Sequence, residues 1–61
     1  MKANLIKRKE RKLEGYYQTR ALCEDMLKTA DKADVPTIKQ ELTKCQQKIQ
    51  ELIEEIRELK A

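Results

Sequence analysis

The side chains of this chain that could do chemistry are a basic run, two cysteines and two adjacent tyrosines. The run KRKERK fills positions 7–12 with five basic residues and one acid, and such a run can grip phosphate groups. Cys23 and Cys45 are potential nucleophiles or metal ligands. Tyr16 and Tyr17 are of a residue type that is enriched in protein interfaces. Which chemistry is open to the chain depends on the elements that position these side chains.

The composition argues against catalysis. The chain has no histidine and no serine, and its single glycine leaves no glycine-rich loop for phosphate. Two separated thiols supply too few ligands for a metal ion. The carboxylates are spread along the sequence and do not converge. We therefore predict no enzyme activity, no cofactor and no metal site.

The second half of the chain carries an unbroken heptad pattern. From Pro36 onward, the apolar residues are spaced by alternating steps of four and three, a spacing typical of a coiled-coil seam. They are Ile38, Leu42, Cys45, Ile49, Leu52, Ile56 and Leu59. Ile53 widens this seam on one side. Pro36 suits the first turn of a helix and disfavours helical dihedrals at Val35, so we expect a helix over about 36–60.

The first half is less regular. The same spacing selects two charged residues, Lys9 and Arg20, together with Ile6, Leu13, Tyr16, Cys23, Leu27 and Ala30. Gly15 lies inside this segment, where glycine costs about 1 kcal/mol relative to alanine. Asp31, Asp34 and Pro36 mark a turn over about 31–35. We expect the first helix over about 4–30.

The two seams fit each other in an antiparallel arrangement. With the turn centred between residues 32 and 33, Leu27 meets Ile38, Tyr16 meets Ile49 and Ile6 meets Leu59. The sequence thus predicts an all-α fold, a two-helix antiparallel coiled-coil hairpin that forms one domain over residues 1–61. Its length should be about 40 Å, against about 80 Å for one continuous helix. Two flanking pairs of opposite charge, Lys12 with Glu55 and Glu24 with Lys39, should support the register.

Both cysteines fall on the seam, where cysteine acts as a small apolar residue. They lie in different layers of this register, so we expect two reduced thiols and no intrachain disulfide. Two cysteines are also too few for a disulfide scaffold, which favours a reducing, cytoplasmic location. No run of eighteen apolar residues could span a membrane.

The hairpin places the basic run beside the acidic residues of ELIEEIREL. Residues 1–20 carry a net charge of +5 and residues 41–61 a net charge of −1, so we expect the run to be partly neutralised within the chain. Nucleic-acid binding is disfavoured, because the chain is only +3 overall and lacks interleaved aromatic residues. An acidic protein partner stays open as an alternative.

The stretch RKLEGYYQTRALCEDML resembles the first helix of the Rho-effector homology repeat, and TKCQQKIQELIEEIREL resembles the second. This repeat is the antiparallel coiled-coil finger of protein-kinase-C-related kinases, rhotekin and rhophilin. Lys12, Leu13, Glu14 and Gly15 follow the order of residue types that is frequent in the family, and the likeness covers about residues 5–60. The resemblance implies a signalling module that binds a Rho-family small GTPase in its nucleotide-loaded form.

We expect the partner-binding flank to contain Lys12, Tyr16, Tyr17 and Arg20, together with Ile53. Adjacent tyrosines cannot both point into a seam, so Tyr17 should lie at its edge. Two readings of Tyr17 stay open: contact with a partner, or packing over Ile53 and Gln46. Arg20 at a seam position either marks the register or reaches a carboxylate of the partner.

A rival hypothesis is an oligomerisation segment. The isoleucines and leucines of the second helix favour parallel coiled-coil dimers, and a hairpin could also form a homodimer as a four-helix bundle that buries Ile53 and Tyr17. The heptad pattern still runs at Leu59, so we expect the chain to be part of a larger scaffold or structural protein in this case.

Overall fold

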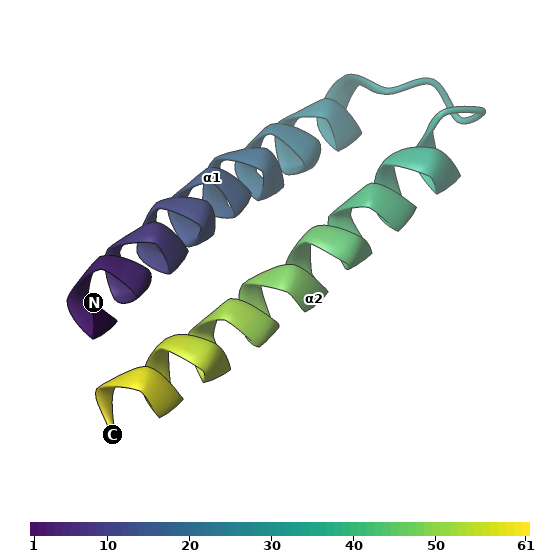
Figure 1. Ribbon diagram of the computed structural model, residues 1–61. Coiled ribbons are helices and arrows are strands. Elements are labelled where there is room, and N and C mark those ends of the chain that lie inside the picture. The colour runs from purple at the N-terminus through teal and green to yellow at the C-terminus, as the bar shows by residue number, and fades with distance from the viewer.

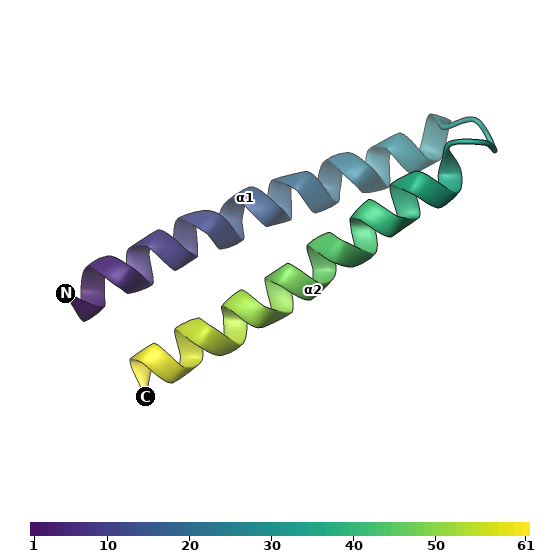
Figure 2. The same ribbon diagram turned by 45° about the vertical axis from the view of Figure 1, so that its right-hand side comes forward.

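Two antiparallel helices joined by a short loop make up the chain (Figure 1). The computed structural model describes all 61 residues. Helix α1 spans Lys2–Thr29 and helix α2 spans Val35–Lys60. The molecule is 46 Å long and only 14 by 11 Å in cross-section, and both termini lie at the same end (Figures 1 and 2). The predicted all-α helical hairpin is confirmed.

The loop between the helices is fixed by local hydrogen bonds. Helix α1 ends at Thr29, and the extended backbone of the next residue, Ala30 (φ −72°, ψ 146°), turns the chain away from the helix axis. The amide of Asp34 donates to the carbonyl of Asp31 at 2.9 Å, and the amide of Ile38 donates to the carbonyl of Asp34 at 3.1 Å. This last bond draws Val35 into the first turn of α2, although a residue before proline disfavours that conformation. The helix therefore begins one residue earlier than expected, with proline in its first turn.

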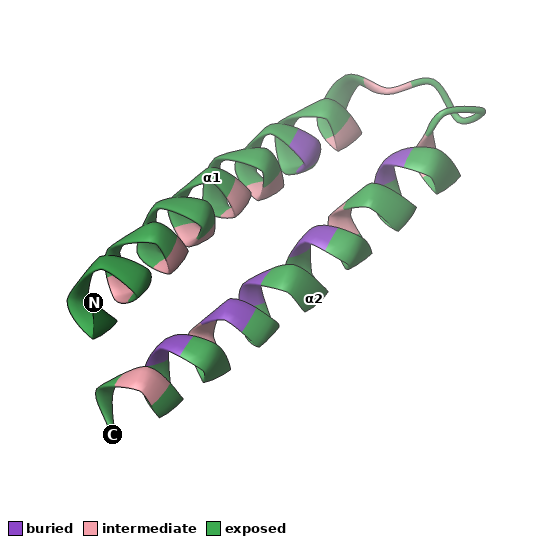
Figure 3. Cartoon of the chain, in the orientation of Figure 1, coloured by how far each residue is buried: buried purple, intermediate pink, exposed green.

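The core lies mainly on α2. Five of the six buried residues belong to this helix: Ile38, Cys45, Ile49, Leu52 and Ile56. On α1 only Cys23 is buried, and the other members of its predicted seam are half-buried. Figure 3 shows the buried stretches of α2 turned toward a row of half-buried residues on α1. Helix α1 contributes less because charged Lys9 and Arg20 and the polar end of Tyr16 occupy layers that would otherwise hold aliphatic residues.

Both predicted flanking ion pairs are wrong, and each carboxylate has a different partner. Glu55 accepts from Lys9 at 2.7 Å, one turn before Lys12. Lys9 occupies a seam position with its side chain 25% exposed, so its ammonium group must leave the apolar layer, and Glu55 receives it there. Glu24 pairs with Arg20 on its own helix at 3.9 Å, because i,i+4 residues are closer than the facing Lys39.

The basic run is partly neutralised by the helix beside it, as the sequence indicates. Lys9 pairs with Glu55, and Glu10 within the same run pairs with Lys60 at 3.6 Å. These two contacts tie the open end of the hairpin together on its two sides. Arg8, Arg11 and the remaining bases of the run form no ion pair.

Candidate functional site

The five residues expected to bind a partner lie on two different sides of the hairpin. Lys12 and Tyr17 are five positions apart, which corresponds to about 140° around a helix axis. Lys12 and Tyr16 line a groove on one side, and Tyr17 does not. The expectation of one surface holding both Lys12 and Tyr17 is therefore wrong, because the seam runs between them.

Ion pairs identify which residues share a side. Glu10 of α1 pairs with Lys60 of α2. Tyr17 follows Glu10 by one heptad, and Ile53 precedes Lys60 by one heptad. Because the helices are antiparallel, a heptad forward along α1 and a heptad back along α2 both lead toward the loop. Tyr17 and Ile53 therefore lie on the same side of the hairpin as the Glu10–Lys60 pair. We call this surface the Tyr17 flank: Tyr17, Arg20 and Glu24 from α1 with Ile53 from α2.

Tyr17 and Arg20 are held together on this flank. The guanidinium carbon of Arg20 lies 5.0 Å from the centre of the Tyr17 ring, within the range of a cation–π contact. The same guanidinium group faces Glu24, with Nε 3.9 Å from the carboxylate. Arg20 thus leaves its seam position by extending along the surface. Tyr17 itself remains 38% exposed, so part of this side chain is open to a partner.

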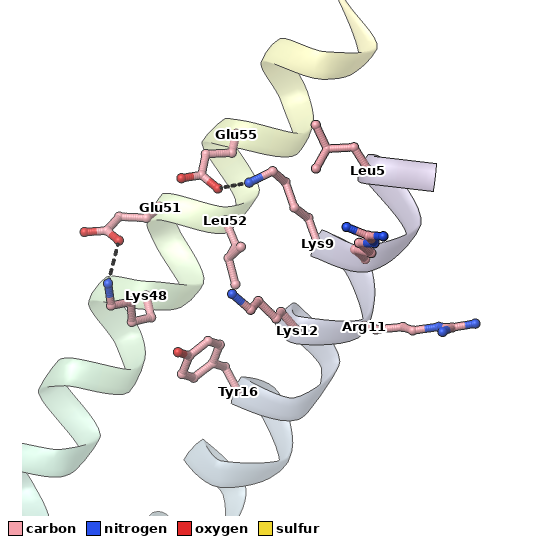
Figure 4. Close-up of a pocket in the computed structure, with 10 residues that line it drawn as sticks. Leu5, Lys9, Arg11, Lys12, Tyr16, Lys48, Glu51, Leu52 and Glu55 are labelled. Atoms are coloured by element: carbon pink, nitrogen blue, oxygen red, sulfur yellow. Dashed lines mark hydrogen bonds and ion pairs between the residues drawn. The ribbon is translucent and has the colours of Figure 1, made fainter. Parts of the chain in front are cut away.

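The opposite side holds a groove at the open end of the hairpin, with a volume of about 770 Å³. Its apolar lining comes from Leu5, Tyr16 and Leu52, and its rim is charged: Arg8, Lys9, Arg11, Lys12, Lys48, Glu51 and Glu55. Figure 4 shows the ring of Tyr16 turned toward α2, whereas the side chain of Arg11 points away from it. Tyr16 is therefore a border residue of the core and not part of the Tyr17 flank.

Some of the charged residues that line this groove have an ion-pair partner and others do not. The hydrogen bond from Lys9 lowers the pKa of Glu55, with Lys12 and Lys48 adding smaller effects in the same direction. Lys48 pairs with Glu51 at 3.4 Å. Arg8, Arg11 and Lys12 have no carboxylate of their own. The α1 side of the groove therefore keeps three basic residues without an ion-pair partner, whereas every charged residue on the α2 side has one.

The two cysteines are free and buried. The thiol of Cys45 donates to the carbonyl of Tyr16 at 3.0 Å. Burial raises the pKa of Cys45, Cys23 raises it further, and the nearby Arg20 opposes both effects. A thiol held protonated and out of solvent is a poor nucleophile, which fits the expectation that Cys45 is a packing residue, and the burial of Cys23 fits the same role.

Sequence reasoning missed two exposed apolar residues on the side of α1 next to its core seam. Leu22 is 61% exposed and Met26 is 45% exposed. They belong to a second set of positions with alternating spacings of three and four, displaced by one residue from the seam. That pattern is visible in the sequence, but the stronger seam beside it and the charged Arg8 and Lys12 within it conceal it.

No group of three or more potential ligands among the acidic residues and cysteines lies close enough to hold a metal ion. Neither helix is long and apolar enough to cross a membrane. Comparison of the chain with protein-family models, with characterised proteins and with solved structures finds no match.

Proposed function

We propose that the chain is a non-enzymatic protein-binding module that uses the Tyr17 flank to dock on an acidic protein surface in the cytoplasm. The observation that carries this proposal is the pairing of Tyr17 with Arg20. Tyrosine and arginine are, with tryptophan, the residue types that are enriched among the residues that dominate binding energy at interfaces. Here the hairpin presents them side by side and already oriented.

The stacked arrangement reduces the cost of binding. A free tyrosine or arginine side chain loses rotamer freedom when a partner immobilises it, at about 0.5–1.5 kcal/mol for each side chain. The contact between Arg20 and Tyr17 restricts both side chains before a partner arrives. On docking, a partner carboxylate can take over Arg20 from Glu24, whose 3.9 Å pairing is long and exposed.

The partner class that we propose is a Rho-family small GTPase in its nucleotide-loaded form. The likeness of residues 12–15 and of the second helix to the Rho-effector homology repeat supports this choice. The net charge of +3 favours encounter with an acidic surface. Ile53 on the neighbouring border of α2 would add apolar area next to the ring of Tyr17.

Calorimetric titration of loaded and unloaded Rho-family GTPases tests the proposal. Tyr17→Ala should weaken binding about 30-fold, the effect of losing about 2 kcal/mol at a hot spot. Tyr17→Phe should retain most of the affinity, because the ring and its stacking remain. Circular dichroism should show the same helicity for all variants, since Tyr17 is exposed.

Lys12→Ala is the matched control, because Lys12 is a charged residue of the same helix on the opposite side. We expect it to change affinity by less than about threefold, as for a charge outside the contact area. Equal losses of affinity for Tyr17→Ala and Lys12→Ala, or the same affinity for loaded and unloaded GTPases, would contradict the proposal.

A further inference from the structure

The side of α1 opposite the Tyr17 flank carries exposed apolar and basic residues and no acidic residue. Leu5, Arg8 and Lys12 line the groove at the open end (Figure 4), and heptad steps lead from them along the same side of the hairpin toward the loop. We call this surface the groove side of α1; its members are Leu5, Arg8, Lys12, Gly15, Thr19, Leu22 and Met26. The acidic residues of the helix lie at other positions: Glu10, Glu14, Glu24 and Asp25.

Three large apolar side chains on the groove side are left in contact with water. Leu5, Leu22 and Met26 are all exposed, and Tyr17 on the opposite flank is the only other exposed large apolar residue within the two helices. Leu5 and Met26 are 21 positions apart, a distance of about 32 Å along a helix. Basic and small residues separate Leu5 from Leu22, so the apolar side chains form separate points along the helix and not one continuous strip.

The basic residues of the groove side have no partner within the chain, whereas the carboxylates that face them across the groove do. Arg8 and Lys12 form no ion pair, and neither does Arg11 on the rim of the groove. On the α2 wall, Glu51 and Glu55 are each paired with a lysine. The uncompensated charge on this side of the hairpin is therefore positive.

We propose that the groove side of α1 docks on a membrane surface that contains anionic lipids. Basic side chains are attracted to anionic headgroups, and apolar side chains beside them enter the boundary between headgroups and acyl chains. A membrane suits the spacing of this side, because separated apolar side chains can each enter it individually. A helical peptide would instead need apolar anchors at successive turns of the helix, which Gly15 and Thr19 interrupt.

Docking through the groove side leaves the Tyr17 flank exposed. The two surfaces lie on opposite sides of the seam, since Lys12 and Tyr17 are about 140° apart around the helix axis. One hairpin can therefore contact a membrane and bind a protein partner at the same time.

Cosedimentation of the chain with lipid vesicles tests the proposal. We expect binding to phosphatidylcholine vesicles that contain about one-third phosphatidylserine, and little binding to phosphatidylcholine alone, because the basic side chains supply much of the affinity. Raising the salt concentration from about 0.05 M to about 0.5 M should release the chain, since salt screens exposed charges. No binding to the anionic vesicles at low salt, or equal binding to both kinds of vesicle, would overturn the proposal.

Matched charge reversals test which side of the hairpin contacts the membrane. Arg8→Glu should weaken binding to the anionic vesicles about 30-fold, because it removes one favourable charge and adds an unfavourable one. Lys39→Glu is the control with the same change in net charge: Lys39 is exposed, forms no ion pair and lies two heptads before Ile53 on the Tyr17 flank. It should weaken binding by less than about threefold. Equal losses for the two variants would mean that overall charge, and not this side, governs binding.

The apolar contribution is tested by Leu22→Gln. Glutamine is nearly as favourable as leucine in a helix and Leu22 is exposed, so circular dichroism should show unchanged helicity. Binding to the anionic vesicles should weaken about fivefold, as expected for losing the burial of a partly exposed leucine. Ala21→Gln, at an exposed position outside the groove side, should bind as the original chain does. Unchanged binding by Leu22→Gln, or binding to an acidic helical peptide in place of vesicles, would overturn the proposal.

Discussion

Replacing Gly15 with alanine should stabilise the hairpin, although glycine stands in the middle of a long helix. The substitution adds a methyl group into open space, since no atom lies within 4 Å of the new Cβ. The backbone at Gly15 already has the negative φ that alanine adopts. The hydrogen bond from the Thr19 hydroxyl to the Gly15 carbonyl, at 3.0 Å, does not involve the side chain at position 15.

The expected gain follows from helix propensity alone. Alanine is favoured over glycine by about 0.8–1.0 kcal/mol at an interior helix position. A 61-residue domain has a free energy of unfolding of roughly 3–9 kcal/mol, so the gain is a sizeable fraction of the total. For a domain of this size it should raise the melting temperature by about 4–8 °C.

Thermal unfolding followed by circular dichroism measures this effect, at a concentration where the chain sediments as a monomer. Ala21→Gly is the matched control, because Ala21 is also exposed in the interior of α1. It should lower the melting temperature by a similar amount. A lower melting temperature for Gly15→Ala would refute the reasoning, since it would mean that the hairpin itself requires glycine at this position.

Three further predictions concern the core and the titrating groups. Ile49→Ala removes a buried side chain that is 5% exposed and should cost about 2–5 kcal/mol, which chemical denaturation would register as a large fall in the midpoint; an unchanged midpoint would contradict the seam. Because the Lys9 hydrogen bond lowers the pKa of Glu55 from 4.5, its stabilising effect should be present above pH 4.5 and disappear as the pH falls through the lower folded value. Glu55→Gln should lack this part of the acid dependence in the same denaturation assay, and an identical acid profile would argue against the ion pair. Because burial raises the pKa of Cys45 above 9.0, the contribution of this protonated thiol to stability should be fully present below pH 9 and be lost as the pH rises through the folded value. Cys45→Ala should flatten that alkaline decline, and a decline of unaltered slope would assign it to another group.

Much of the fold follows from the spacing of the apolar residues. The seam of α2 combines an unbroken heptad with a proline that sets the helix start, and all of its members are buried or half-buried. Even charged Lys9 and Arg20 were placed correctly on the seam of α1, because their neighbours at three and four positions fix the phase of the helix.

The ion pairs on the surface could not be predicted from the spacing of the apolar residues. A long lysine side chain at the open end can reach several carboxylates, and only the three-dimensional arrangement selects Glu55 for Lys9 in place of Lys12. Arg20 likewise bonds along its own helix to Glu24 instead of leaving Glu24 to Lys39. Assigning Lys12 and Tyr17 to one flank failed because proximity in the sequence does not determine which side of the seam a residue occupies.

The most direct test of the central claim, that the Tyr17 flank is the partner-binding surface, is chemical-shift mapping by NMR. The ¹⁵N-labelled chain would be titrated with an unlabelled, nucleotide-loaded Rho-family GTPase. The largest changes should cluster at Tyr17, Arg20 and Ile53, while Gly15 and Lys12 stay near their free positions. Changes centred on Lys12 and the groove beside it, or no changes with any loaded GTPase, would contradict the claim.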